Sequence, residues 1–178
     1  LDFEMFEIFK SKIESGLFKD LKSSKIGGNH FRDYVYIALN VNEDKWAEEF
    51  IENYSHYLPK ELKENNINTA KAFLYLKRKN YDDAVKYIKK LNRKFHIHDL
   101  DFYTIQIFAA YDSGNIVECL RVYKIFKEYL NNNSSFPGNI KKGPVNFLKI
   151  LRILISYKET GNKYLLNEIE QTIENTGE

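Results

Sequence analysis

The amino-acid sequence predicts an all-α fold, built as a stack of about four helical hairpins. Apolar residues recur with helical spacing along nearly the whole chain, and no segment shows sustained period-two alternation. The chain contains 13 Tyr and 13 Phe residues but only 8 Gly and 3 Pro. Many large rings and few turn-forming residues favour helices with short connections over a β-sandwich or barrel.

The first half of the chain predicts five helices. Their apolar residues lie within 6–17, 31–39, 46–58, 62–79 and 81–91. Asn42 or Asp44 suits a cap for the third helix, and Asn80 suits a cap for the fifth. Pro59 marks the boundary before the fourth helix, since proline tolerates a first-turn position. We expect that fourth helix to be irregular across its asparagines at 65–68.

The second half predicts four more helices, with apolar residues within 102–110, 116–130, 144–155 and 165–173. Asp99 suits a cap for the first of these, and Pro144 restarts the third after a polar loop at 131–143. The helices at 102–110 and 144–155 are apolar on nearly every side, so we expect each to lie between neighbours. The loop is interpreted as an insertion between hairpins.

The composition indicates one folded domain over residues 1–178. Hydrophobic residues make up 43% and charged residues 29%, close to the average for globular proteins. The lone Cys119 lies in an apolar pattern, where we expect a buried and inert thiol. The apolar window at 147–157 is too short to span a bilayer. Because the chain opens without Met or a signal core, we expect a fragment of a longer protein, and a cytoplasmic location is favoured.

The turns inside the predicted hairpins recur at a regular interval. Trp46, Tyr81 and Ile116 each follow such a turn and are 35 residues apart, and Tyr164 follows 48 residues later. The longer last step equals the same period plus 13 residues, which the 131–143 loop can supply. A period near 34 with paired helices is typical of one class of helical repeat.

The chain resembles the tetratricopeptide repeat family, with degenerate motifs. Tyr81 to Ala84 resembles the aromatic and small residues that open the second helix of that repeat, and Ala72 and Tyr75 match its first helix. Ile116 and Cys119 take the equivalent places in the next unit. The first-helix Trp, Leu and Gly of the family and its closing Pro are absent. The resemblance implies a right-handed α-α superhelix that binds proteins or peptides.

No residue cluster predicts catalysis, a cofactor or a metal. His96 and His98 lie beside Asp99 and Asp101, but no Cys or third His is near in sequence, so a solvated linker is expected instead of a zinc site. His30 and His56 are isolated. The paired carboxylates at 43–44, 48–52 and 82–83 fall in first turns or on polar helix faces, where they favour the helix dipole. Gly27-Gly28 lacks the further residues of a phosphate loop.

A basic band is the remaining candidate for a site. Residues 58–98 hold 11 basic and 4 acidic residues, whereas residues 1–57 hold 7 and 11. The candidate partner-binding residues are the following cations of the band: Lys77, Arg78, Lys79, Lys86, Lys89, Lys90, Arg93 and Lys94. Lys71 and three tyrosines, at 75, 81 and 87, are interleaved with them. Such a band can be a solvated face, can attract an acidic protein, or can bind single-stranded nucleic acid.

The sequence therefore predicts a non-enzymatic helical-repeat scaffold for protein or peptide partners. The alternative is an adaptor that binds RNA or single-stranded DNA through the basic band from Lys71 to Lys94.

Overall fold

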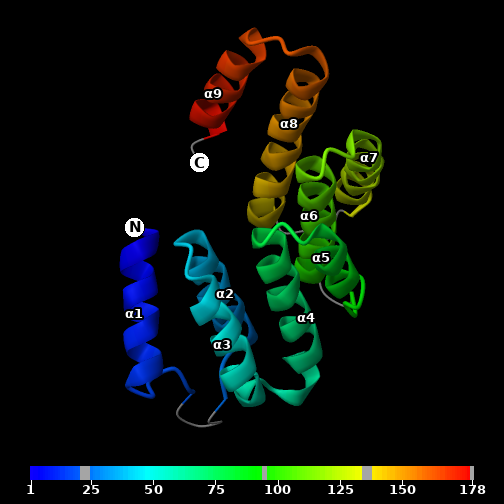
Figure 1. The fold of residues 1–178 in the computed structure, drawn as a ribbon. Coiled ribbons are helices and arrows are strands. Elements are labelled where there is room, and N and C mark those ends of the chain that lie inside the picture. Colours follow the sequence, from blue (N-terminus) through cyan, green and yellow to red (C-terminus); the bar gives the residue numbers. More distant parts are fainter. Residues whose placement is uncertain (21–24, 94–95, 134–137, 177–178) are drawn as a thin grey trace. The chain divides into compact units, whose positions relative to one another are not determined.

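The computed structural model describes residues 1–20, 25–93, 96–133 and 138–176. The regular secondary structure of these residues is entirely helical, with no strand (Figure 1). The predicted all-α class is confirmed. The chain divides into two compact units, Leu1–Ala109 and Ala110–Glu178, which are described separately below. The prediction of one continuous repeat domain stays a prediction.

Unit 1 contains six successive α-helices and a 3₁₀ turn among its described residues. They are α1 (Asp2–Glu14), α2 (Gly28–Asn40), α3 (Asp44–Tyr54), a 3₁₀ turn (Ser55–Tyr57), α4 (Lys60–Lys77), α5 (Tyr81–Ile88) and most of α6 (His96–Asp112). Helix α4 packs on α2 and α3 as well as on its hairpin partner α5 (Figure 1). Ile105 of α6 joins Ala72 and Ala84 in one apolar cluster. Successive hairpins of unit 1 therefore share a core.

Aromatic rings fill much of that core. Trp46, Phe50 and Tyr54 follow one another along one face of α3, with ring centroids 5.1 and 5.2 Å apart and nearly parallel planes. Phe31 of α2 lies against Phe50 at 5.0 Å and is completely buried. The predicted stripe is confirmed for Trp46, Phe50 and Tyr54, whereas its last residues, Tyr57 and Leu58, lie beyond the end of α3. These rings account for part of the high aromatic content, since each buries roughly 150–250 Å².

The two hairpin turns of unit 1 have the same backbone hydrogen bonds. Asn42 and Lys79 have positive φ angles of 64° and 58°. The N–H of each donates to the carbonyl three residues earlier, at 3.2 and 3.0 Å. The next N–H donates to the carbonyl five residues earlier, at 2.8 and 2.9 Å. This is the Schellman arrangement, which closes a helix with a left-handed residue.

Unit 2 contains the end of α6 and helices α7 (Ile116–Asn132), α8 (Gly138–Thr160) and α9 (Tyr164–Thr176). Helix α8 packs on both α7 and α9. Gly114 and Gly161 occupy the turns with φ angles of 80° and 68°. Asn115 caps α7 by accepting a hydrogen bond from the Glu118 N–H at 3.1 Å, and Asn80 caps α5 in the same way. Cys119 is fully buried, as predicted.

Several predicted boundaries are wrong. Leu17 lies beyond the end of α1 and is 73% exposed. The chain is continuously helical from Lys60 to Lys77, since the Asn66 side chain bonds the Leu62 carbonyl within the helix and does not break it. Asp99 lies inside α6 and pairs with Arg93, so it is not a cap.

The predicted loop at 131–143 is also too long, because α7 extends to Asn132 and α8 begins at Gly138. Pro144 lies inside α8 and does not start it. Proline lacks an N–H, which leaves the carbonyl of Ile140 without its helical partner, and Ile140 is 45% exposed, where water can supply that bond. Part of the loop, 134–137, lies outside the described residues.

A polar cleft between helices α2, α4 and α6

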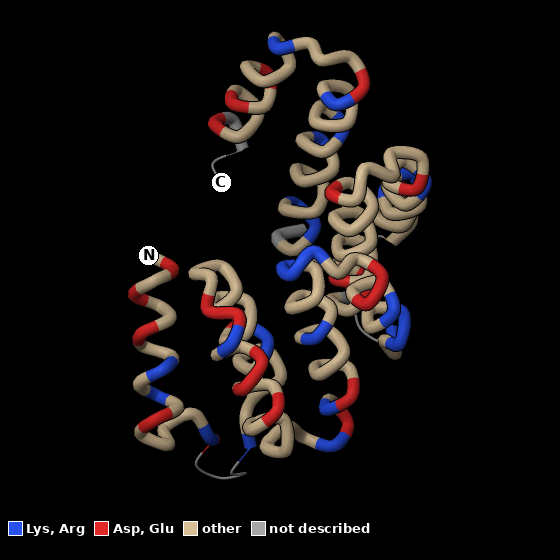
Figure 2. Tube along the Cα trace, in the orientation of Figure 1, with Lys and Arg blue, Asp and Glu red and all other residues tan. Residues whose placement is uncertain are grey.

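The predicted basic band lies at the two ends of α5. Lys77, Arg78 and Lys79 precede this helix, and the others lie within it or after it. Figure 2 shows the two groups of cations at opposite ends of α5, with the acidic residues of its first turn between them. Lys94 lies outside the described residues. The band is therefore divided along the helix.

Several cations of the band have partners within unit 1. Arg78 makes two hydrogen bonds to the Glu48 carboxylate, at 2.9 and 2.7 Å. Lys86 pairs with Asp83 at 3.4 Å, and the Lys90 ammonium lies 4.4 Å from the Tyr87 ring centroid.

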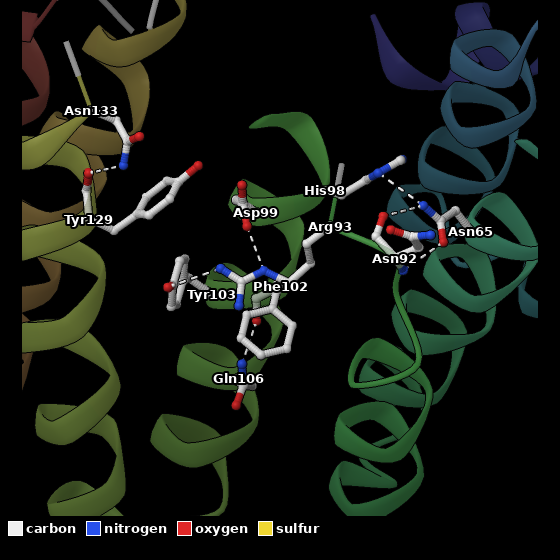
Figure 3. A network of polar contacts seen from close by, with 10 residues as sticks. All are labelled: Asn65, Asn92, Arg93, His98, Asp99, Phe102, Tyr103, Gln106, Tyr129 and Asn133. Carbon is white, nitrogen blue, oxygen red and sulfur yellow. Dashed lines mark hydrogen bonds and ion pairs between the residues drawn. The ribbon is translucent and has the colours of Figure 1, made fainter. Parts of the chain in front are cut away.

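Arg93 donates to Asp99 and to the Tyr103 hydroxyl (Figure 3). Its guanidinium also lies 4.2 Å from the Phe102 ring centroid. Tyr75 and Tyr87, which could have stacked on bases, stack on each other at 5.3 Å. These internal contacts weaken the case for a nucleic-acid surface.

A cleft of about 470 Å³, with mostly polar residues in its lining, lies between α2, α4 and α6 in unit 1. It is lined by Gly27, Gly28, Asn29, His30, Arg32, Leu62, Asn66, Thr69, Ile97, His98 and Asp101. Several of these residues stand out in the sequence, but nothing in the sequence predicts that they lie together.

Two glycines open the cleft at the start of α2. Gly27 has an extended backbone, with φ −62° and ψ 138°, and no side chain caps the helix. A Cβ on Gly28 would lie 3.0 Å from Asn66 Nδ2 and 3.3 Å from Leu62 Cδ1, so glycine allows a close approach to α4 that a larger residue could make only if these side chains shifted. The first-turn N–H groups of α2 have no intrahelical acceptor and carry the positive end of the helix dipole.

An ion pair between Arg32 and Asp101 joins α2 to α6 across the cleft, with an N–O distance of 2.7 Å. The Asp101 side chain is 6% exposed, and its Oδ2 atom has no hydrogen-bond partner. Burial raises the pKa of Asp101 to about 6, and Arg32 opposes the shift. Arg32 uses one of its five donors on Asp101, which leaves the others for a ligand.

His98 is held in one tautomer by Asn65 (Figure 3). The Asn65 Oδ1 atom accepts from the Asn92 N–H at 2.9 Å, which fixes the amide orientation. Its Nδ2 group lies 3.0 Å from His98 Nδ1 and can only donate, so Nδ1 is the acceptor and Nε2 carries the hydrogen. Burial lowers the pKa of His98, which favours the neutral ring.

The predicted solvated linker at His96–His98 is wrong, because His98 lies in α6 and is buried. The side chain of His96 is not among those described. Asp101 follows His98 by three residues, a helical spacing that places both on one face. The sequence contains this three-residue spacing. Interpreting Asp99 as an N-cap, however, puts the predicted start of the helix after His98, so the two side chains are not expected on one helix face.

The lining of the cleft offers both hydrogen-bond donors and hydrogen-bond acceptors. Cys119 lies outside it, and burial raises the pKa of that thiol to about 11. Among the described side chains, no three His, Cys, Asp or Glu residues are grouped so that they could hold a metal ion. Within the same part of the chain, no helix is long and apolar enough to cross a membrane.

No protein-family model, curated protein or solved structure matches this chain. The resemblance to tetratricopeptide arrays therefore stays a prediction.

Proposed function

We propose that the chain is a non-enzymatic scaffold of stacked helical hairpins that binds a protein or peptide segment, and that the cleft between α2, α4 and α6 is a binding site. The observation that carries the proposal is the cleft itself, which lies between successive hairpins and is bridged by the Arg32–Asp101 pair. Its volume of about 470 Å³ falls within the range of ligand sites.

The lining favours a segment rich in hydrogen-bond acceptors. The spare donors of Arg32 and the first-turn N–H groups of α2 offer positive hydrogen-bonding partners on one side of the cleft. A peptide supplies acceptors at every backbone carbonyl. Buried Asp101 fixes the orientation of Arg32, so less side-chain entropy is lost on binding.

The repeated construction of the hairpins supports the scaffold part of the proposal. Ala47, Ala84 and Cys119 are the fourth residues of α3, α5 and α7, and each is fully buried. Small residues there let each helix approach its neighbours closely, as a stack of hairpins requires. Trp46 is the third residue of α3, so its predicted equivalence with Tyr81, the first residue of α5, is displaced by two positions.

A selection from a random peptide library displayed on phage, with the purified chain as bait, tests the proposal. Enriched peptides are then measured against Gly27→Trp, which fills the cleft from a backbone position open to any residue, and against the matched control Gly27→Ala. We expect Gly27→Trp to abolish binding and Gly27→Ala to retain it. A selection that enriches nothing, or peptides that bind Gly27→Trp as well as the parent chain, contradicts the proposal.

A further inference from the structure

A second depression, of about 230 Å³, lies between α7 and α8 within unit 2. Helix α7 contributes Tyr123, Lys127, Leu130 and Asn131, and α8 contributes Val145, Leu148 and Lys149. The spacings within each set are those of one helix face, so two aligned stripes form the walls of a groove. This α7–α8 groove involves no residue of the polar cleft.

The groove has an apolar floor and a cationic rim. Leu130 and Leu148 at the floor are 1% and 4% exposed. Lys127 and Lys149 at the rim are exposed, and neither makes an ion pair with a described residue. The volume is below the roughly 300 Å³ at which small-molecule sites begin, so the groove has room for a few side chains of a larger partner.

The helices around the groove are strongly basic. Residues 116–160 contain 8 Lys or Arg residues but only 3 Asp or Glu residues. Arg121 is neutralised by Glu118, with N–O distances of 2.6 Å, and Lys158 lies against Tyr111. This excess of positive charge is local to α7 and α8, and it favours an anionic partner over a basic one at the groove.

We propose that the α7–α8 groove is a docking site for an acidic amphipathic helix of a partner protein. One or two apolar side chains of that helix enter the floor over Leu130 and Leu148, and flanking carboxylates pair with Lys127 and Lys149. Helix-in-groove recognition uses such anchors at intervals of three and four residues.

The aliphatic floor decides against the other anionic partners. Nucleic acid would bring phosphates and flat bases to a floor that has aliphatic side chains and a single ring, Tyr123. A lipid surface requires apolar side chains that project outward, whereas Leu130 and Leu148 lie at the bottom of a concave surface.

Fluorescence polarisation with two designed peptides tests the proposal on the whole chain. Both are helices of about 16 residues with the same Leu and Phe stripe, and they differ in carrying either Glu or Lys at every polar position. We expect the Glu peptide to bind at about 50 mM salt and to weaken as salt rises, whereas the Lys peptide does not bind.

Charge reversal at the rim provides the decisive variant. Lys127→Glu with Lys149→Glu should weaken the Glu peptide by about tenfold or more and allow the Lys peptide to bind. The control, Lys124→Glu with Lys163→Glu, changes the net charge equally at exposed positions outside the groove and should leave the preference for the Glu peptide intact. Gly27→Trp should also have no effect, which separates this site from the cleft.

Three results would overturn the proposal. The first is no binding of the Glu peptide to the parent chain at millimolar concentration. The second is equal loss of affinity in the rim variant and in the control. The third is tighter binding of a single-stranded oligonucleotide, or of vesicles containing phosphatidylserine, with the same dependence on Lys127 and Lys149.

Discussion

Asp101 places a carboxylate in the interior of unit 1, where Arg32 bonds one of its oxygens and the other has no partner. Burying an ionised carboxylate costs free energy that a single ion pair repays only in part. The pKa of about 6 expresses this balance, since burial favours the protonated form more than Arg32 favours the charged form. The presence of Asp101 is better explained by the fixed orientation that it gives to the Arg32 side chain than by a gain in the free energy of unfolding.

This burial predicts a distinctive pH dependence of stability. The folded pKa of about 6 lies above the unfolded value near 3.9, so between these values the folded chain binds more protons than the unfolded chain. The free energy of unfolding should therefore decrease as pH rises through this window, by roughly 3 kcal/mol from Asp101. Urea unfolding of the parent chain and of Asp101→Asn at pH values across the window measures this contribution.

The difference in unfolding free energy between the parent chain and Asp101→Asn isolates Asp101, because His98 titrates in both proteins. The sign for His98 is opposite, since its lowered pKa makes stability fall as pH drops below the unfolded value of about 6.5. A parent-minus-variant difference that stays constant with pH would show that Asp101 is not buried as described.

At the scale of the element, the hairpin turns differ mainly in the residue that occupies the left-handed position. Lys79 holds φ 58° in the α4–α5 turn, whereas Gly114 holds φ 80° in the α6–α7 turn. A side chain in this conformation costs roughly 1–2 kcal/mol, which glycine avoids. The α4–α5 turn is therefore the more strained of the two.

Exchange of residue types should reveal this strain. Gly114→Ala is expected to lower the free energy of unfolding by about 1 kcal/mol through its backbone alone, because nothing lies within 4 Å of the added Cβ. Lys79→Gly should raise it by a few tenths to about 1 kcal/mol, because relief of the left-handed strain outweighs the greater flexibility of glycine in the unfolded chain. Chemical denaturation measures both, and a loss of stability in Lys79→Gly would contradict the argument.

The fourth residue of α3, α5 and α7 is small in each helix, and this repeated feature gives another prediction. Ala84 is fully buried in α5 and belongs to one apolar cluster with Ala72 and Ile88. Ala84→Leu should destabilise the chain by about 1–3 kcal/mol through overpacking. Cys119→Ala, at the equivalent position of α7, removes a single atom and should cost about 1 kcal/mol or less. Thermal unfolding compares the two, and equal losses would contradict close packing at Ala84.

Across the whole molecule, the sequence predicts the helices far better than the cleft. Residues such as Phe31 and Phe50 repeat with the helical period, so their burial follows from local pattern. The cleft depends instead on pairs distant in sequence: Arg32 and Asp101 are 69 residues apart, and Asn65 and His98 are 33 apart. Periodicity carries no information on such pairs, and polar residues at 98 and 101 are expected on the surface until a partner is known.

The distribution of charge over the molecule predicts weak nucleic-acid binding. Leu1–Ala109 contains 18 basic and 17 acidic residues, and Ala110–Glu178 contains 9 and 8, so neither unit has a large net charge. Non-specific binding depends on many phosphate contacts, and its dissociation constant is typically about 1–100 μM at physiological salt. We expect no binding of a fluorescent single-stranded RNA in this range. Micromolar binding with a steep salt dependence, lost in Lys86→Ala with Lys89→Ala and Lys90→Ala, would instead support the basic band as an RNA surface.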